Sequence, residues 1–296
     1  MTESLGFRKV LTLSVTEKVQ CLALRVSTAI VVALLCVAIA PRAASAQGVN
    51  NNCASLPGNG ALKHALTQAV LAETSGLNLH MWATIVARDG TVCAVAFSGT
   101  TSGSQWLGSR VISAQKASTA NFFSLDGTSA SNNSGMTNGL ALSTANLYSA
   151  VQPGGSLFGL QESNPVNPAV AYDGDSDAYG TLLDPMNGKK PGGVNVFGGG
   201  LALYDTGGKM IGAVGVSGDT SCADHVIAWK LRHALSLDHV PHATVITGDP
   251  VRPDNIVYDI TKPGGSQAVD ATSASGWGHP HCLATDVNPS SLPAVP

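Results

Sequence analysis

Charged side chains are scarce in this sequence, basic ones above all. Lysine and arginine together number 16 among 296 residues, and charged residues make up 12% of the chain. Residues 1–46 hold five of the basic and two of the 19 acidic residues, so the remainder carries 11 basic and 17 acidic ones, a net charge of −6. Proteins bind nucleic acid by neutralising its phosphates. An acidic chain without a basic stripe is therefore not expected to bind nucleic acid.

Several short motifs of enzyme sites are also absent. No lysine follows the glycine-rich segments in the Walker A arrangement, and no G-x-G-x-x-G opens a helix. Gly215–Gly218 lacks the G-x-S-x-G spacing of a serine nucleophile, and H-E-x-x-H does not occur. The sequence thus gives no indication of a phosphate-binding loop, a catalytic triad or a zinc protease.

Only one long apolar run occurs, close to the N-terminus. Val26–Ala40 is uncharged, follows a segment with four basic residues, and leads to small residues at Ala44 and Ala46. This pattern is typical of a secretory signal peptide, and the run is shorter than the roughly 20 residues that cross a bilayer. We therefore expect cleavage after Ala46 and a secreted or periplasmic protein, not bound to a membrane after cleavage; an uncleaved N-terminal anchor is the alternative.

Four cysteines follow the predicted signal peptide: Cys53, Cys93, Cys222 and Cys282. An even number in an oxidising compartment favours two disulfides, for which three pairings exist. We expect Cys53–Cys93 and Cys222–Cys282, because each bond would tie an irregular terminal segment to a regular element. A metal site is the alternative. The cysteines lack the close paired spacing of such sites, although residues 279–282 (HPHC) offer ligands for a soft metal.

Hydrophobic periodicity predicts three main helices and two hairpins. Helical stripes occur in Ala61–Gly76, Ser109–Ser124 and Cys222–Leu237, the last with Ser221 as its N-cap and Asp224 three positions later. β-rich runs flank turns at 89–90 and 205–208. Consecutive hairpins imply antiparallel pairing, and the helices must cover the sheet. The predicted fold is α+β, a single antiparallel sheet covered by helices.

Long segments of weak periodicity separate and follow these elements. Residues 124–193 show only one clear helix, near Leu140–Val151, and an internal stretch of this length is usually functional or mobile. Residues 239–296 are rich in Pro, Gly and Ser, and we expect a tail draped over the domain and pinned by Cys282. The predicted organisation is a signal peptide (1–46), one domain (47–238) with an insertion (124–193), and an irregular tail (239–296).

One acidic run in the insertion resembles a calcium-binding loop. The segment Asp173–Asp184 (DGDSDAYGTLLD) places oxygen donors at EF-hand-like positions. However, Ala178 stands where glycine is wanted, the twelfth position is aspartate, and the flanks do not read as helical. A solvated acidic loop is the default interpretation, and calcium binding is the alternative.

Two blocks of the sequence carry a recognisable pattern. The first contains Ser109, Ala114, Lys116-Ala117, Thr119-Ala120 and Phe122; the second contains Phe197-Gly198-Gly199, Gly212–Gly218, Asp224, Ala228 and Ala234-Leu235. Together they resemble the GlcG/HbpS-like haem-binding domain family, whose domain also forms the C-terminal part of PduO-type proteins. The resemblance covers residues 60–124 and 194–237. It implies an α+β fold, frequent homo-oligomers and a haem or related tetrapyrrole ligand, and haem degradation is attached to the family name.

The glycines of the second block allow two interpretations. Glycine in or beside a strand commonly marks the close approach of another backbone or of a ligand. Gly212, Gly215 and Gly218 would then let the covering helices pack tightly on the sheet. Alternatively, Gly198–Gly200 beside Phe197 would form one wall of a flat apolar slot for a planar macrocycle.

Candidate haem contacts follow from the chemistry of iron and from the resemblance. Haem iron takes His, Cys, Met or Tyr ligands, and with the cysteines in disulfides histidine leads. His80 is the predicted ligand. Lys116 would pair with a propionate, unless it is a surface lysine, and Asp224 would touch a ligand or partner subunit, unless it caps its helix. The predicted cofactor-binding residues are His80, Lys116, Phe197, Gly198, Gly199 and Asp224, without catalytic or metal-binding residues.

Three other histidines are interpreted as surface residues. His64 lies off the apolar stripe of its helix, and His225 and His233 lie in the first and last turns of the final helix. A place at the mouth of a pocket is the alternative for His225.

The sequence thus predicts a secreted or periplasmic haem-binding protein that holds a tetrapyrrole between sheet and helix, as a homo-oligomer. An enzyme that degrades haem oxidatively, or acts on another small molecule in the same cleft, is the first alternative. A non-binding interaction module is the second, because Ala87 and Ala96–Gly99 lack charges that family members often carry there.

Overall fold

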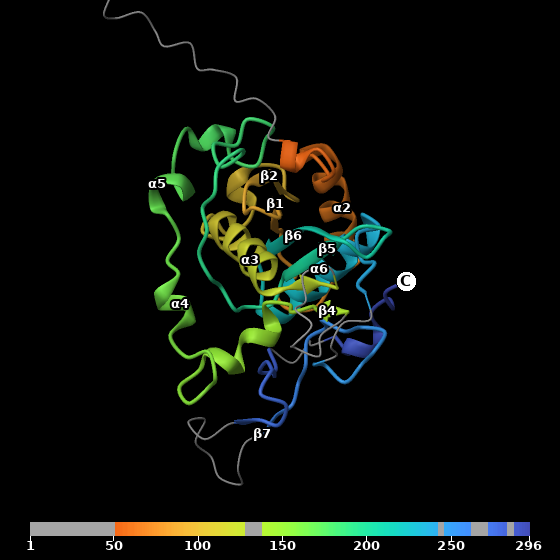
Figure 1. The fold of residues 1–296 in the computed structure, drawn as a ribbon. Coiled ribbons are helices and arrows are strands. Elements are labelled where there is room, and N and C mark those ends of the chain that lie inside the picture. Colours follow the sequence, from red (N-terminus) through yellow and green to blue (C-terminus); the bar gives the residue numbers. More distant parts are fainter. Residues whose placement is uncertain (1–50, 128–137, 242–245, 262–271, 283–286) are drawn as a thin grey trace, which may run out of the picture. The chain divides into compact units, whose positions relative to one another are not determined.

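Four strands form the central sheet of the protein (Figure 1). The computed structural model describes residues 51–127, 138–241, 246–261, 272–282 and 287–296. The strands are β1 (Trp82–Ala87), β2 (Val92–Phe97), β5 (Gly200–Tyr204) and β6 (Met210–Ser217), in the order β2-β1-β6-β5 with every pair antiparallel. The predicted α+β fold around an antiparallel sheet is confirmed. The predicted signal peptide lies outside the described residues, and the domain boundaries stay a prediction.

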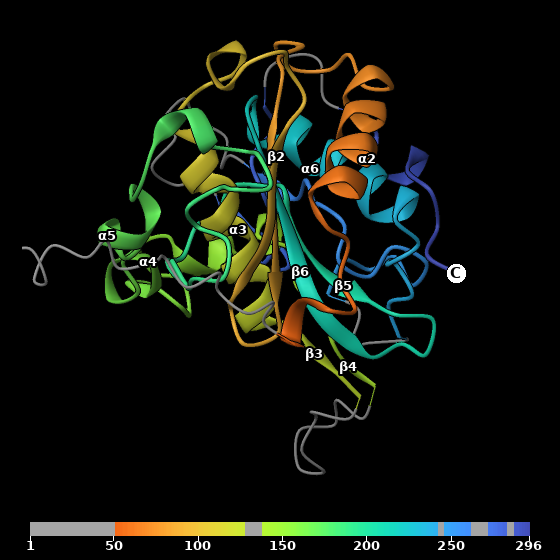
Figure 2. The same cartoon turned by 90° about the horizontal axis from the view of Figure 1, so that it is seen from above.

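Three helices cover the two faces of this sheet (Figure 2). α2 (Asn59–Leu71) and α6 (Ser221–Ala234) pack on one face, and α3 (Ser109–Phe123) lies on the other. Aliphatic side chains fill the α2/α6 side, whereas Trp82, Phe97 and alanines of α3 fill the opposite side. All residues of β1 and β5 are buried, because both faces of the sheet meet other parts of the protein. Such strands form continuous apolar runs rather than alternating patterns.

Small side chains bring α3 close to the sheet. Ala114, Ala117 and Ala120 are fully buried, and a Cβ at Gly215 would lie 2.0 Å from the carbonyl oxygen of Ser113. Any side chain at Gly215 would therefore displace the helix. The close packing that the small residues of this helix predict is confirmed.

The N-terminus of α6 differs from the predicted one. Thr220 is the N-cap, with an extended backbone and a hydroxyl that accepts the Ala223 N–H, and Ser221 is the first helical residue. Two adjacent hydroxyl residues both suit a cap, and only the backbone conformation distinguishes them. The prediction of Ser221 as N-cap is therefore wrong by one residue.

The insertion consists of short elements joined by turns. They are β3 (Leu125–Asp126), β4 (Gly139–Leu140), η3 (Ala145–Leu147), η4 (Ser149–Val151), α4 (Leu160–Ser163), α5 (Pro168–Ala171) and η5 (Ser176–Ala178). The helix predicted near Leu140–Val151 is wrong, since two 3-10 turns follow β4 there. Asn146 accepts the backbone N–H of Ser143 at 2.9 Å, and such local side-chain bonds compete with a regular α-helix.

A buried ion pair attaches the insertion to α3. Arg110 Nε and Nη2 donate to Asp184 at 2.9 and 2.5 Å, and Nη1 donates to the carbonyl of Ala171 at 2.8 Å. The guanidinium lies 3.6 Å from the ring centre of Tyr179. Asp184, the last donor of the calcium-like run, is thus occupied by a cation of the protein. Asp173, the first donor, pairs with Lys189. These ion pairs favour the interpretation as an acidic loop, and calcium binding stays a prediction.

The tail crosses α6 and is attached to it by polar contacts. Arg232 Nη1 and Nη2 bind Asp254 at 2.6 and 2.9 Å with both side chains fully buried, and Trp229 Nε1 donates to the carbonyl of Pro293 at 3.0 Å. Regular structure is limited to β7 (Ile260–Thr261), β8 (Thr272–Ser273) and η7 (Pro289–Ser291). The described tail is irregular, as predicted.

Both predicted disulfides are present. Cys53–Cys93 joins η1 (Asn51–Cys53) to β2, and Cys222–Cys282 joins α6 to the tail. One further 3-10 turn, η2 (Ser102–Ser104), precedes α3. Within the described part of the chain, no helix combines the length and hydropathy that a membrane span requires.

Candidate functional site

Two predicted ligand contacts, Lys116 and Asp224, meet each other at the end of the sheet. Lys116 Nζ lies 2.6 Å from Asp224 Oδ2 and donates to the carbonyl of Val216 at 3.0 Å. Both side chains are buried, so the interpretation of Lys116 as a surface residue is wrong. Because α3 and α6 lie on opposite faces of the sheet, this ion pair joins the two helix layers.

The neighbouring glycines make room for these helices and their ion pair. A Cβ at Gly198 would lie 2.3 Å from the carbonyl oxygen of Ser221, and one at Gly199 would lie 3.1 Å from the Cβ of Asp224. A Cβ at Gly200 would lie 2.5 Å from the carbonyl oxygen of Lys116 in α3. These contacts favour the close packing of helices and sheet, and the binding of a macrocycle beside Gly198–Gly200 stays a prediction.

Burial dominates the electrostatics of the pair. Burial raises the pKa of the Asp224 carboxyl to about 6, because the loss of solvent outweighs the attraction of Lys116. Burial also lowers the pKa of the Lys116 ammonium. Asp224 additionally accepts the backbone N–H of Asp219 at 2.9 Å. The geometry gives both side chains a structural role, and their contact with a ligand stays a prediction.

His80 and Phe197 are the members of the predicted set that solvent reaches. Strands β1 and β5 run in the same direction and start at the same end of the sheet, so these two residues lie at a common edge. His80 is exposed, with Nδ1 3.2 Å from the hydroxyl of Ser98, and Phe197 is 49% exposed. An exposed imidazole held through Nδ1 offers Nε2 to a ligand, and the role of His80 stays a prediction.

His225 is fully buried, and its predicted surface position is wrong. The backbone N–H of Ile256 lies 3.1 Å from Nε2, because the tail covers this side of α6. Burial lowers the pKa of His225 to about 4, and the positive charge of Arg232 acts in the same direction. The tail lacks periodicity, so no pattern in the sequence predicts that it covers α6. His64 and His233 are exposed, as predicted.

A large cavity lies between the insertion and the tail, away from Gly198–Gly200. It has a volume of about 840 Å³ and is lined by residues 148–150 and 152–156 of the insertion together with Ile260, Thr272, Ser273, Gly276 and Pro280 of the tail. Its lining is mostly apolar and includes the half-buried ring of Tyr148. Ligand sites typically enclose about 300–1,000 Å³ and carry few polar groups. Sequence reasoning missed this site, although the length of the insertion marked the region as functional.

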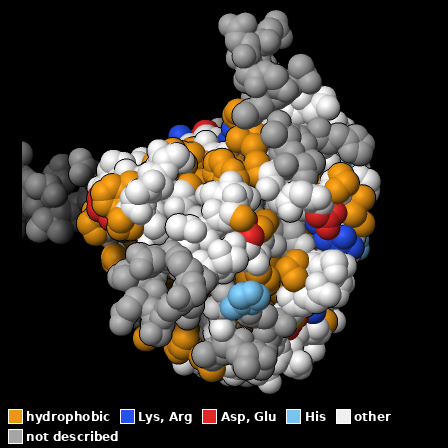
Figure 3. All heavy atoms as spheres, turned by 90° about the horizontal axis from the view of Figure 1, so that it is seen from below, with side chains coloured by type: hydrophobic (Ala, Val, Ile, Leu, Met, Phe, Trp, Pro, Cys, Tyr) orange, Lys and Arg blue, Asp and Glu red, His pale blue; other side chains and the backbone are white. Residues whose placement is uncertain are grey.

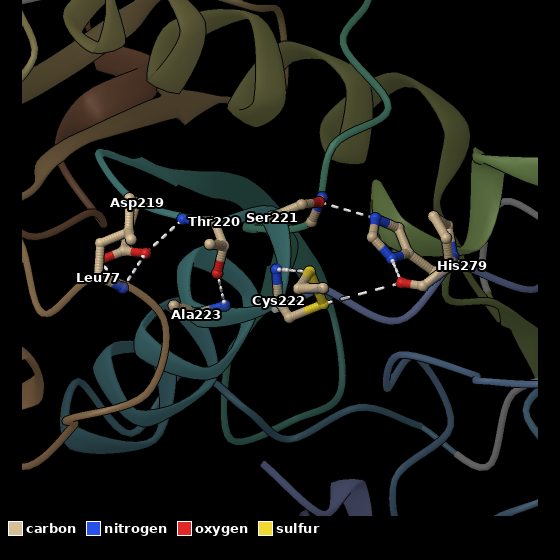
Figure 4. Close-up of a disulfide and its surroundings, with 10 residues drawn as sticks. Leu77, Asp219, Thr220, Ser221, Cys222, Ala223 and His279 are labelled. Carbon is tan, nitrogen blue, oxygen red and sulfur yellow. Dashed lines mark hydrogen bonds between the residues drawn. A yellow bond between two sulfur atoms is a disulfide. The ribbon is translucent and has the colours of Figure 1, made fainter. Parts of the chain in front are cut away.

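Behind Tyr148, His279 faces the first turn of α6 (Figure 4). Its ring centre lies 5.1 Å from that of Tyr148, and its Nε2 lies 2.7 Å from the hydroxyl of Ser221. Nδ1 lies 2.7 Å from the carbonyl oxygen of Pro280, to which it donates, so Nε2 accepts the proton of Ser221. The Cys222–Cys282 disulfide lies beside the ring. These contacts hold the wall of the cavity against α6.

The fold and these sites agree with one protein family. The sequence profile of the family described as "Haem degrading protein HbpS-like" matches residues 61–231, which is more than half of the chain. The protein therefore belongs to the HbpS-like family, as its two sequence blocks indicated. A search of curated proteins found no match.

Several solved structures are similar at low identity. A PduOC–haem complex is 23% identical, with 59% of this chain and 89% of that chain covered and a TM-score of 0.38. The Klebsiella pneumoniae protein ORFY is 24% identical, with 60% and 88% covered and a TM-score of 0.37. A double mutant of Streptomyces reticuli HbpS is 15% identical, with 60% and 83% covered and a TM-score of 0.34.

Proposed function

We propose that this protein binds haem or a related tetrapyrrole outside the cytoplasm. Membership of a haem-degrading family over residues 61–231 is the observation that carries the ligand class. The signal-like pattern of residues 1–46 and the two disulfides support a secreted or periplasmic location. On the face drawn in Figure 3, hydrophobic side chains lie among uncharged ones and charged groups are few. Such a surface suits a small apolar ligand better than a polyanion.

The cavity beside Tyr148 is the place for the macrocycle that the geometry supports best. Its volume of about 840 Å³ is in the range of cofactor sites, whereas the glycines between sheet and helix have no room for a single Cβ. Tyr148 would supply a phenol oxygen, one of the side-chain ligands that haem iron accepts. Ala150, Ile260 and Pro280 would supply apolar wall. His80 is the other candidate ligand, at an exposed edge.

A haemin titration of the purified mature protein tests the proposal. We expect a Soret band that saturates at one haemin per chain, because the proposed cavity has the volume of a single cofactor site. Cobalamin, whose corrin ring is bulkier and carries its own axial base, serves as the competing ligand. A linear increase in absorbance without saturation would contradict haem binding and leave the chain as an interaction module.

Turnover of haem is the second candidate function, and the family description favours it. The haem-loaded protein would be given ascorbate and oxygen, and the Soret band followed over time. Loss of the band with release of iron to a chelator would indicate oxidative degradation. A stable band would indicate a carrier.

We also propose that the protein forms homo-oligomers. Trp106 and Leu107, neighbours just before α3, are 53% and 67% exposed, and adjacent exposed apolar side chains are common at subunit contacts. Light scattering after gel filtration tests this, with Leu107→Asp as the variant expected to shift the mass toward the monomer. An unchanged monomeric mass for the wild type would contradict it.

A further inference from the structure

The Cys222–Cys282 disulfide has a third metal-ligating side chain beside it. The sulfur atoms and a ring nitrogen of His279 all lie within 4.8 Å of one another. Cys222 and His279 are buried, and Cys282 is half-buried. Figure 4 shows the disulfide and the imidazole together at the first turn of α6. Among the described residues, this is the one group of three such side chains close enough to share an ion.

The surroundings of the sulfurs favour thiolates once the disulfide is open. Cys222 is the second residue of α6, a helix of 14 residues, and the N-terminal end of a helix carries the positive end of the helix dipole, which favours a neighbouring anion. The backbone N–H of Cys222 also points at Cys282 Sγ, at 3.1 Å. A hydrogen bond to the charged form stabilises it further. Both features would act on the reduced protein without moving α6.

We propose that this cluster is a redox-gated metal site that binds Zn²⁺ or a similar borderline-soft divalent ion when reduced. In the oxidised protein the S–S bond occupies both sulfurs. A dithiol reductant transfers two electrons and two protons, so that the S–S bond breaks, two thiols form, and the reductant becomes a disulfide. The ion then binds two thiolates and Nε2 of His279, which exchanges its hydrogen bond from Ser221 for the ion, and the two thiol protons pass to solvent.

The donor set selects the class of ion. Two thiolates and one imidazole match the ligands of Zn²⁺, which is bound at about 2.3 Å by sulfur and about 2.0 Å by nitrogen, with water in a fourth position. Ca²⁺ and Mg²⁺ prefer oxygen ligands. This inference does not depend on haem, because the cluster lies behind the cavity wall and Tyr148 is not one of its ligands.

Cobalt substitution provides the test on the full mature chain. The protein is reduced with a phosphine under nitrogen and titrated with Co²⁺, whose tetrahedral thiolate complexes absorb in the near ultraviolet and the visible. We expect one Co²⁺ per reduced chain, displaced by Zn²⁺, and no such bands from the oxidised protein. Absence of the bands from the reduced protein would overturn the proposal.

Variants distinguish this site from the other disulfide and from exposed histidines. Cys53→Ser/Cys93→Ser, which removes the other pair, should leave the bands unchanged, and so should His64→Ala on the surface of α2. Cys222→Ser/Cys282→Ser should abolish them. His279→Ala should weaken Co²⁺ binding at least ~10-fold, the scale of effect that even an outer-shell partner has. Equal affinity in the His279 variant would overturn its assignment as a ligand.

One measurement on the unaltered sequence avoids the risk that variants misfold. X-ray absorption of the Zn²⁺-loaded reduced protein should show two sulfur and two nitrogen or oxygen scatterers. Reoxidation should release the ion in step with loss of free thiols. A shell of nitrogen and oxygen alone, or metal retained after the disulfide has reformed, would contradict the proposal.

Discussion

The sheet with its three long helices differs from the predicted insertion (124–193) and tail (239–296), here called the added segments, in the interactions that hold it together. In the former, two apolar clusters pack the three long helices on the two faces of the sheet. The insertion and the tail share a separate apolar cluster around Leu142, Leu147 and Val196, and are tied to the long helices by a few strong anchors, namely Arg110–Asp184, Arg232–Asp254 and the Cys222–Cys282 bond. Every described residue that lines the cavity belongs to the added segments. The sheet and its long helices thus form the frame, and the proposed ligand site lies wholly in the added segments.

This difference explains which parts the amino-acid pattern could predict. Burial of a helix or strand face repeats along the chain with the period of the element, whereas one buried Arg–Asp pair leaves no repeat. Anchors of this kind are also sensitive, because removing one partner leaves a buried charge. Substitutions in the two regions should therefore lower the free energy of unfolding by different amounts. The loss at a buried ion pair should be recovered by replacing the second partner as well.

The largest effect is expected at the anchor of the tail. Arg232→Met leaves Asp254 buried without its cation, which should lower the free energy of unfolding by about 3–5 kcal/mol. Adding Asp254→Leu should recover most of this loss, because an apolar pair of similar size needs no solvation. Urea unfolding followed by circular dichroism provides the values. The exposed pair Lys190–Asp89 is the control, and Lys190→Met should cost less than about 1 kcal/mol. If Arg232→Met and Lys190→Met lowered the free energy of unfolding equally, the distinction between buried anchors and surface pairs would be contradicted.

The Cys222–Cys282 disulfide should contribute slightly less to the free energy of unfolding than the Arg232–Asp254 pair. Its loop spans 60 residues, for which loss of chain entropy in the unfolded state predicts about 4 kcal/mol. The Cys53–Cys93 loop spans 40 residues, so the two double serine variants should differ by less than about 1 kcal/mol in unfolding free energy. The two double serine variants should differ more in their sensitivity to limited proteolysis than in their unfolding free energy. Cys222→Ser/Cys282→Ser should expose the tail to limited cleavage while the sheet stays protected, and simultaneous cleavage of both regions would argue against a separate anchor.

Acid should loosen the contact between α6 and the tail through His225. Its pKa is about 4 in the folded protein, below the ordinary value of 6.5, so the unfolded chain binds the proton more tightly. Stability from this group is complete above pH 6.5 and is lost as the pH falls toward 4, by about 3 kcal/mol in all. His225→Gln, which does not titrate, removes this loss. Asp224, whose pKa is raised to about 6, acts in the opposite direction over the same range, so the quantity to compare is the difference in unfolding free energy between wild type and variant. This difference should change by about 3 kcal/mol between pH 6.5 and 4 for His225→Gln and stay constant for the exposed His64→Gln, and a constant difference for His225→Gln would refute the assignment.

The smallest of these effects concerns the packing of the domain itself. Gly215→Ala places a methyl group against the backbone of α3, which should cost about 1–3 kcal/mol through overpacking. Gly60→Ala is the matched control, because it lies in α2 with open space around it and should stabilise the helix by up to about 1 kcal/mol. Melting temperatures of the two variants should therefore shift in opposite directions. Shifts of the same sign would mean that helix propensity, not the approach of α3, decides the outcome.

Much of the frame could be predicted from residues alone. The helix at Ser109–Phe123, the two hairpins and both disulfides follow from periodicity, turn residues and the position of the cysteines. The site could not be predicted to the same extent. Lys116 and Asp224 match the family pattern, yet a sequence does not reveal that two distant charges neutralise each other inside the protein. Tyr148 and His279 come together only through the tail, whose apolar and polar contacts do not repeat along the sequence.

The central claim is that the added segments hold the ligand, and one side-by-side haemin titration tests it most directly. Tyr148→Phe removes only the phenol oxygen in the cavity, and His80→Ala removes the exposed imidazole at the end of the sheet. The account predicts that Tyr148→Phe shifts the Soret band and weakens haemin binding at least ~10-fold, about 1.4 kcal/mol, while His80→Ala binds as the wild type does. The reverse result, an unchanged Tyr148→Phe spectrum with binding lost in His80→Ala, would contradict it and place the ligand on the family domain.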